Sequence, residues 1–280
     1  MRKWAIIVLI AVLAVGGAWF LYGRARQEPV IEGPAVSVRF LDDEFGNALL
    51  VRTPEGKVAV IDPTRRRATA LIGLLNDEQV RELTVVISDP SYDSASAVAR
   101  LQRSVKIERV ICARQDRTPG QWESMLVRAR FKPVARNFVQ PGGSTKLSPT
   151  VRLDVLSPGN GTRRSDGSCV IRLTYRGKSV FYIAQLHAEA EAALISSGIN
   201  LQSSVLAVGE RAGRDNPSIE LLSKVRPELC VLCSNRPSAS VVSRLKSENS
   251  GATLFRTGKD GIIEIVSNGR SVQSMTGGGP

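Results

Sequence analysis

Residues 83–112, LTVVISDPSYDSASAVARLQRSVKIERVIC, decide the fold class of this chain. Leu83 to Ile87 is a short, fully apolar run of the kind that forms a buried strand. Ser94 to Leu101 carries its apolar residues at helical spacing, and Val105 to Cys112 is expected to form the next strand. A strand, a helix and a second strand in succession predict parallel strands whose two faces are both covered.

The segments on either side of this unit predict the rest of the architecture. Val36 to Leu41 alternates, and Ala48 to Val51 leads through the turn 53–57 into Val58 to Ile61, which is typical of a hairpin. The second half repeats this order, with a hairpin over 169–183 followed by alternating strands and helices up to residue 266. Because the halves match, we predict two sheets packed face to face with helices outside.

The N-terminal segment predicts a membrane anchor. Trp4 to Tyr22 contains no charge, and about 20 helical residues cross the hydrocarbon core of a bilayer. A cleaved signal peptide is the alternative, although its apolar region is usually only about 7–15 residues long. We expect a cytoplasmic tip and transmembrane anchor over 1–26, a linker over 27–35, a folded domain over 36–270 and a disordered tail over 271–280.

The orientation of this anchor follows from its short N-terminal tail. Arg2 and Lys3 precede the apolar run, and Arg24 and Arg26 follow it, so the basic flanks nearly balance. A tail this short usually stays cytoplasmic. We therefore expect a single-pass protein of the cell (inner) membrane, with its globular domain outside the cytoplasm.

The net charge indicates an anionic partner. The formal net charge is +12, and +10 remains once Arg2 and Lys3 are set aside. Basic clusters lie at 65–67, over 128–136 and at 163–164, but no aromatic residues alternate with them as a platform for stacked bases would require. Nucleic acid is therefore a candidate partner on charge alone, beside the membrane itself and an unidentified protein.

The four cysteines are expected in the core. Cys112, Cys169, Cys230 and Cys233 each lie in an apolar, β-branched stretch. The CxxC from Cys230 to Cys233 has the spacing of a redox or zinc half-site, but it lies in an expected strand and no second CxxC completes a zinc set.

The ordered set of segments resembles the metallo-β-lactamase domain of the ComEC competence family, the bacterial DNA-uptake proteins. That domain opens with Leu-Asp-Val-Gly-Gln-Gly-Asp-Ala, then Ile-Arg-Thr-Pro-x-Gly and Leu-Ile-Asp. The resemblance covers roughly residues 36–270 and implies an αββα sandwich, here preceded by one N-terminal transmembrane helix. The matching stretches are 41–48 (LDDEFGNA), 51–56 (VRTPEG), 60–62 (VID), 165–168 (SDGS), 170–175, 188–194, 251–252, 256–257 and 260–261.

The family's metal-binding residues are largely replaced. It binds two metals through Thr-His-x-Asp-x-Asp-His after an apolar strand, through Thr-Gly-Asp after the second hairpin, and through a late His-His-Gly loop. Residues 88–94 here read SDPSYDS, residues 183–185 read IAQ, and residues 209–211 read GER. The degenerate positions are therefore Asp89 and Ser94 in place of histidines, Ser91 in place of an aspartate, the retained Asp93, Gln185 in place of the bridging aspartate, and Glu210 and Arg211 in the late loop, with Asp62 at an earlier strand end.

These replacements favour a protein without catalytic residues, metal or cofactor. His187 is the single histidine, and an amide cannot supply the charge of a bridging ligand. We interpret the chain as a membrane-anchored interaction or assembly module. The first alternative is a ComEC-like hydrolase or nuclease in which Asp62, Asp89, Asp93 and Glu210 hold zinc or another divalent metal. The second is a basic module that binds DNA or an anionic polymer without cleaving it.

Overall fold

A computed structural model of the chain describes residues 31–42, 48–88, 91–113, 119–156, 169–211, 216–247 and 251–277. The chain divides into two compact units, Met1–Glu32 and Gly33–Pro280. The predicted anchor at residues 4–22 lies outside the described residues. Within the described ranges, no helix is long and apolar enough to span a bilayer.

The first sheet holds eight strands among the described residues, in the order β15-β14-β1-β2-β3-β4-β5-β6. Its β15-to-β3 part is antiparallel, and β3, β4, β5 and β6 run parallel. The strands are β1 (Val36–Phe40), β2 (Leu49–Arg52), β3 (Val58–Ile61), β4 (Glu82–Ile87), β5 (Lys106–Ala113), β6 (Ala135–Val139), β14 (Ile262–Ser267) and β15 (Val272–Gly277).

The second sheet repeats this arrangement with seven described strands, in the order β13-β12-β11-β10-β9-β8-β7. Neighbouring strands from β7 through β10 pair antiparallel, and neighbouring strands from β10 through β13 pair parallel. The strands are β7 (Ser144–Lys146), β8 (Val151–Val155), β9 (Cys169–Tyr175), β10 (Lys178–Gln185), β11 (Val205–Arg211), β12 (Leu229–Cys233) and β13 (Thr253–Arg256).

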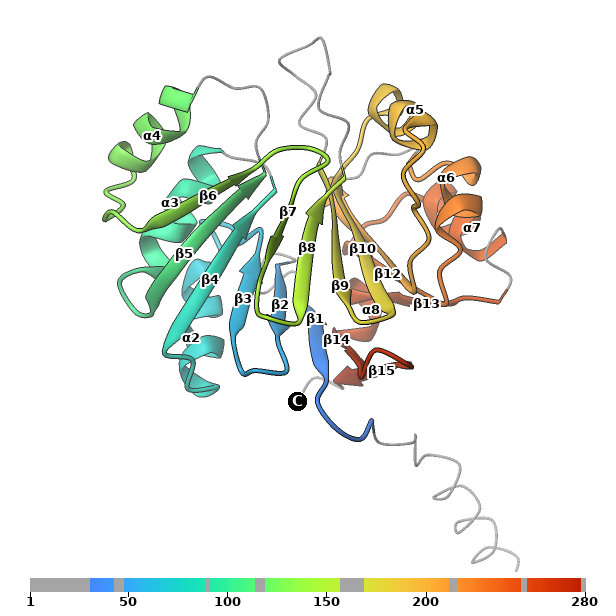
Figure 1. Ribbon diagram of the computed structural model, residues 1–280, viewed down its shortest axis with the longest axis horizontal. Helices are drawn as coiled ribbons and strands as arrows, with labels where there is room; N and C mark the ends of the chain where they lie inside the picture. Colours follow the sequence, from blue (N-terminus) through green and yellow to red (C-terminus); the bar gives the residue numbers. More distant parts are fainter. Residues whose placement is uncertain are drawn as a thin grey trace, which may run out of the picture. The chain divides into compact units, whose positions relative to one another are not determined.

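Helices cover the outer face of each sheet within the Gly33–Pro280 unit (Figure 1). One layer consists of α2 (Ala68–Asp77), α3 (Tyr92–Leu101) and α4 (Pro119–Arg128), and the other of α5 (Ala188–Ser196), α6 (Ile219–Val225) and α7 (Ala239–Ser247). The short α8 (Thr257–Asp260) joins β13 to β14. The four layers confirm the predicted helix–sheet–sheet–helix order.

Strand alternation explains why β3 is apolar on every residue. On β3, Ala59 and Ile61 point between the sheets, while Val58 and Val60 pack under α2 and α3. A third cluster packs the second sheet against α5, α6 and α7. All three clusters belong to the Gly33–Pro280 unit, so this unit carries its own complete core and meets the condition for folding without residues 1–32.

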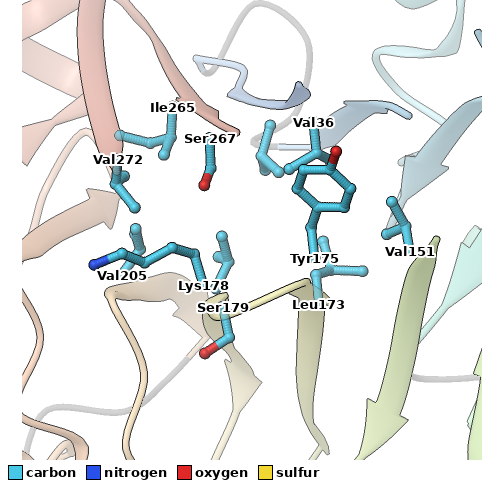
Figure 2. A pocket seen from close by; sticks show the side chains of 12 residues that line it. Val36, Val151, Leu173, Tyr175, Lys178, Ser179, Val205, Ile265, Ser267 and Val272 are labelled. Atoms are coloured by element: carbon cyan, nitrogen blue, oxygen red, sulfur yellow. The ribbon is translucent and has the colours of Figure 1, made fainter. Parts of the chain in front are cut away.

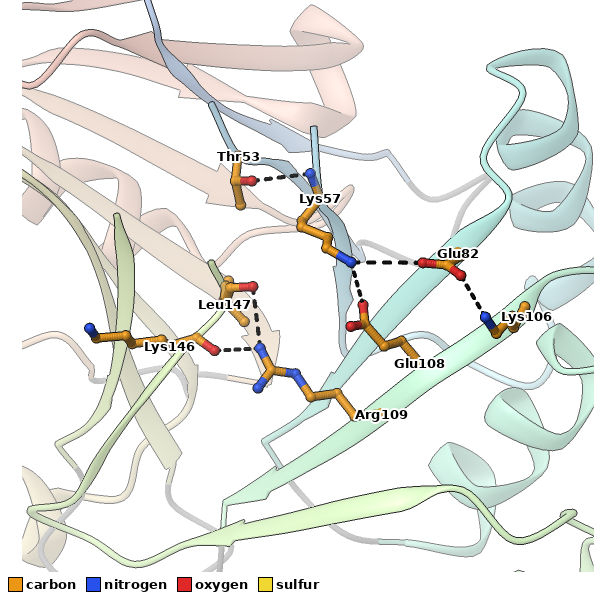
Figure 3. Close-up of polar contacts among 8 residues, drawn as sticks. All are labelled: Thr53, Lys57, Glu82, Lys106, Glu108, Arg109, Lys146 and Leu147. Carbon is orange, nitrogen blue, oxygen red and sulfur yellow. Dashed lines mark hydrogen bonds and ion pairs between the residues drawn. The ribbon is translucent and has the colours of Figure 1, made fainter. Parts of the chain in front are cut away.

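Polar contacts tie the two sheets together near the amino ends of the parallel strands (Figure 3). The guanidinium of Arg109 on β5 donates to the carbonyl oxygens of Lys146 and Leu147 beside β7. The Thr150 hydroxyl donates to Glu55 at 2.6 Å, which joins the β7–β8 turn to the β2–β3 turn. The candidate site lies at the opposite end of the sheets, where the parallel strands end.

The ion pairs in Figure 3 lie on the same end of the first sheet. Lys57 reaches Glu108 at 3.1 Å and Glu82 at 3.7 Å, and Lys106 reaches Glu82 at 2.6 Å. These side chains are exposed, so solvent screens each pair and it contributes little to stability. They need no catalytic explanation.

Two expectations from the sequence require correction. A disordered tail over 271–280 is wrong for 272–277, because these residues form β15 and pair with β14 along its whole length. The polar sequence of the tail carries no strand pattern, because backbone hydrogen bonds to β14, not apolar side chains, hold β15 in place. The sequence also did not predict β6, β7 or α8; β6 is exposed from Ala135 to Phe138 and has no apolar alternation.

Candidate functional site

The candidate site lies where four parallel strands end. Asp62 follows β3, Ser88 follows β4, Gln185 closes β10, and Glu210 is the penultimate residue of β11. In open α/β sheets, ligands bind outside the carboxyl ends of the strands, so a ligand of this fold is expected at this edge.

Asp62 joins the ends of β3 and β4. Its backbone has a positive φ of 53°, and its carboxylate accepts hydrogen bonds from the backbone N–H of Ser88 at 2.7 Å and from the Ser88 hydroxyl. The Asp62 N–H in turn donates to the carbonyl of Val86 at 2.9 Å. Ser88 is 1% exposed, so the carboxylate satisfies a polar group that water does not reach.

Ser91 and Ser94 form the start of α3. The Ser94 N–H donates to Ser91 Oγ at 3.2 Å, and the Ser91 N–H donates to Ser94 Oγ at 2.9 Å. This reciprocal pair is a capping box, which satisfies backbone donors that a helix leaves without partners at its first turn. Both serines stand at predicted metal-ligand positions, and both hold the helix terminus.

Asp93, the one family ligand that the resemblance leads us to expect in that loop, contacts Arg65. Its carboxylate accepts from the Arg65 N–H at 3.2 Å and lies 3.6 Å from the Arg65 Nε. Both side chains are about half exposed, at 50% and 55%. Asp93 therefore fastens the loop between β3 and α2 to the first turn of α3.

Gln185 and His187 meet on the second sheet. The Gln185 Nε2 and the His187 Nε2 lie 3.1 Å apart, and His187 is exposed at the residue that precedes α5. Arg211 pairs with Gln185 in the register of β10 and β11, but the side chains of Glu210 and Arg211 lie outside the described residues, as does Asp89.

The described donors at this edge do not fit a dinuclear zinc centre. Within the described part of the chain, no group of three or more His, Cys, Asp or Glu side chains is placed to hold a metal ion. Asp62 and Asp93 are bound by different partners, Ser88 and Arg65. The other described side chains, those of Ser91, Ser94 and Gln185, offer hydroxyl and amide groups, whereas zinc in proteins is held by imidazole, thiolate and carboxylate.

The cysteines form no second site among the described residues. Cys230 packs beneath α5, α6 and α7, whereas Cys233 points between the sheets, so the two thiols lie on opposite faces of β12. Cys112 is buried beneath the helices of the first sheet. Burial raises the pKa of the Cys112 and Cys233 thiols to about 12. The predicted core role is confirmed for these three cysteines, and the side chain of Cys169 lies outside the description.

A small apolar pocket opens between the sheets, on the side of β14 and β15 (Figure 2). Val36, Tyr175, Val205 and Ile265 line it, and the Tyr175 hydroxyl donates to the carbonyl of Pro34 at 3.0 Å. Its volume of about 20 Å³ accommodates roughly one water molecule. The pocket is therefore a packing gap rather than a substrate site.

No pattern in the sequence indicates a buried carboxylate on the second helical layer. Glu191 is 2% exposed, and its Oε1 accepts the N–H of Ser218 at 2.7 Å, just before α6. Glu189 and Glu191 look alike in the Ala- and Glu-rich stretch, and only the packing of α5 on α6 distinguishes them. Glu191 thus joins two helices and has no role in the candidate site.

Comparisons with known proteins support the fold. No family model and no curated protein matches the sequence. The chain is similar in structure to the metallo-beta-lactamase fold protein YhfI from Bacillus subtilis, with 12% identity, a TM-score of 0.54, and coverage of 82% of this chain and 99% of that chain. Igni18, a metallo hydrolase from the archaeon Ignicoccus hospitalis, shows 14% identity, a TM-score of 0.54, and coverage of 86% and 98%.

A third solved structure, an isothiocyanate hydrolase from Delia radicum gut bacteria, shows 9% identity, a TM-score of 0.50, and coverage of 86% and 99%. Identities this low show the fold alone. The chain therefore has a mixed α/β, two-sheet fold of the metallo-β-lactamase type.

Proposed function

We propose that this chain is a membrane-anchored, non-catalytic protein of the metallo-β-lactamase fold that serves as an interaction or assembly module. On this proposal it is a ComEC-like domain with a degenerate metal site. A fold can persist without its original chemistry, because function depends on the side chains of the site and not on the scaffold.

One observation carries the proposal: the described side chains at three of the expected ligand positions support local structure. Ser91 and Ser94 cap α3, and Asp93 binds the N–H and the guanidinium of Arg65. A metal centre needs ligands whose lone pairs converge on one point. Here Ser91 and Ser94 bind backbone groups of α3, whereas Asp93 binds Arg65, so these side chains do not converge on one point.

The membrane part of the proposal rests on the sequence. Trp4 to Tyr22 is long enough to cross a bilayer, and the short tail before it favours a cytoplasmic N-terminus. We place the globular unit outside the cytoplasm, at the cell (inner) membrane, where its partner is to be sought. Resistance of the full chain to extraction from membranes by carbonate tests the anchor, and release by carbonate contradicts it.

A metal-dependent hydrolase remains the second candidate. The hydrolase names of Igni18 and the isothiocyanate hydrolase favour it, as do Asp62 and Asp93 near the strand ends. In this case hard-metal chemistry would depend on an oxygen-rich site completed by Asp89 and Glu210.

Metal content of the purified full chain separates the two candidates. The protein is expressed with zinc, manganese and iron in the medium, extracted in mild detergent, and analysed for each element. A non-catalytic module holds less than about a tenth of an equivalent of any metal, since structural and catalytic sites retain theirs tightly. One or two retained equivalents that are lost in Asp93→Asn, together with hydrolysis of a nitrophenyl phosphodiester, would establish the hydrolase instead.

A further inference from the structure

The two helical layers differ in charge. The connections that carry α2, α3 and α4 (62–81, 88, 91–105 and 119–134) contain nine basic and five acidic residues among the described positions. The corresponding connections of α5, α6 and α7 (186–204, 216–228, 234–247 and 251–252) contain five and four. The excess of positive charge therefore lies on the layer that covers the first sheet.

Contacts between the helices bring two of the basic clusters seen in the sequence onto one surface. Arg100 donates to the carbonyl of Arg65 at 3.4 Å, which joins α3 to the residues before α2. The Gln102 side chain exchanges two hydrogen bonds with the backbone of Lys132, at 2.8 and 3.1 Å, which joins the end of α3 to the segment after α4. We call this surface the basic face; its exposed members are Arg65, Arg66, Arg67, Arg100, Arg103, Arg128, Arg130 and Lys132.

Most of this charge is not neutralised by the protein itself. Arg65 pairs with Asp93, and the nearby Glu78 is directed at Arg39 and Arg52 of the sheet. Among the described residues, no carboxylate lies within 4.0 Å of the side-chain charges of Arg66, Arg103, Arg128, Arg130 and Lys132.

Apolar side chains stand among these cations. Val127 is 77% exposed and directly precedes Arg128, and Phe138 of the adjacent β6 is 43% exposed. The Arg128 guanidinium lies 5.0 Å from the centre of the Tyr92 ring and covers it, so that this ring is not a free platform for a nucleic-acid base. Exposed apolar groups between arginines and lysines are typical of surfaces that lie in the headgroup region of a membrane.

We infer that the basic face binds the headgroups of anionic lipids and holds the globular unit against the membrane surface. The inference extends the proposed anchoring, because the linker over 27–35 reaches only about 30 Å and keeps the unit close to the bilayer. Each Lys or Arg near an anionic surface contributes attraction that falls off within a Debye length. The basic face then supplies a second attachment that fixes the orientation of the unit.

Vesicle sedimentation of residues 33–280 tests the inference without the anchor, since this unit carries its own core. We expect binding to vesicles with about 30% phosphatidylglycerol in phosphatidylcholine at ~0.1 M salt, no binding to pure phosphatidylcholine, and release as salt rises. The variant Arg103→Glu/Arg130→Glu/Lys132→Glu should lose at least about a hundredfold in partitioning, from roughly a factor of five or more for each charge removed.

The matched control reverses three exposed charges on the other helical layer, in Lys224→Glu/Arg236→Glu/Lys246→Glu. Its net charge changes by the same amount. We expect its partitioning onto the anionic vesicles to be at least tenfold stronger than that of the basic-face variant. Circular dichroism melting verifies that both variants fold. Equal losses in the two variants, or equal binding to neutral vesicles, would overturn the inference.

A DNA oligonucleotide added to the same assay examines the other anionic partner. Displacement of the protein from vesicles by micromolar single- or double-stranded DNA, with tight binding of that DNA, would assign the basic face to nucleic acid and overturn the lipid inference. Failure of the carbonate test with intact vesicle binding would contradict only the anchor.

Discussion

Replacing Asp62 separates a structural from a metal-binding role at the strand ends. In the structure its carboxylate accepts from the Ser88 N–H at 2.7 Å and from the Ser88 hydroxyl, and its backbone has φ of 53°. Asp62→Ala removes both acceptors and places alanine in a left-handed conformation. The lost charge-assisted bond to a buried donor costs about 2 kcal/mol and the backbone about 1 kcal/mol more.

A loss of about 3 kcal/mol lowers the melting temperature of a unit of this size by roughly 6–12 °C. Asp62→Asn is the control, because its amide oxygen still accepts the Ser88 N–H and asparagine tolerates the left-handed region. We expect a decrease of about 2–4 °C for it, and no change in either difference when EDTA is added. The assay is thermal unfolding of residues 33–280 followed by circular dichroism. If Asp62→Ala melted within about 2 °C of the unchanged protein, the structural role assigned to this carboxylate would be refuted.

Three further predictions follow from particular contacts. Gly209→Ala should destabilise the unit by about 2 kcal/mol in urea unfolding, since its Cβ would lie 2.9 Å from a carbonyl oxygen of β10. Gly73→Ala, whose Cβ would have nothing within 4 Å, should stabilise the unit by about 0.5–1 kcal/mol, and the reverse order of stabilities would contradict the packing. Cys233, which is fully buried with its pKa raised to about 12, should not react with a thiol reagent at pH 8 until the protein unfolds, and rapid labelling of the native protein would show otherwise. Several hydrogen bonds, the one from Thr150 contributing most, lower the pKa of Glu55 from 4.5 to about 2, so Thr150→Val should raise this pKa in a carboxyl NMR titration. The small stability difference between the two proteins should be complete above pH 4.5 and vanish as the pH falls through about 2, and an unchanged titration would count against the bond.

The sequence predicted the central elements because their signal is local. Val58 to Ile61 is apolar throughout, and Leu83 to Ile87 is apolar except at Thr84, a pattern that only strands covered on both faces require. The polar edge strands β6, β7 and β15 carry no such signal. They exist because a neighbouring strand offers a row of backbone donors and acceptors, and that depends on residues far away in the chain.

The chemistry of the candidate site divides in the same way. A single histidine, together with serine and glutamine at the expected ligand positions, follows from the sequence by itself, because residue type fixes which atoms are available as ligands. The tertiary structure decided three other features. Asp93 faces Arg65, Cys230 and Cys233 lie in different apolar layers, and the clusters around Arg66 and Arg130 share one helical face. Each of these facts depends on how helices and strands distant in sequence pack together, and periodicity along the chain contains no information about such contacts.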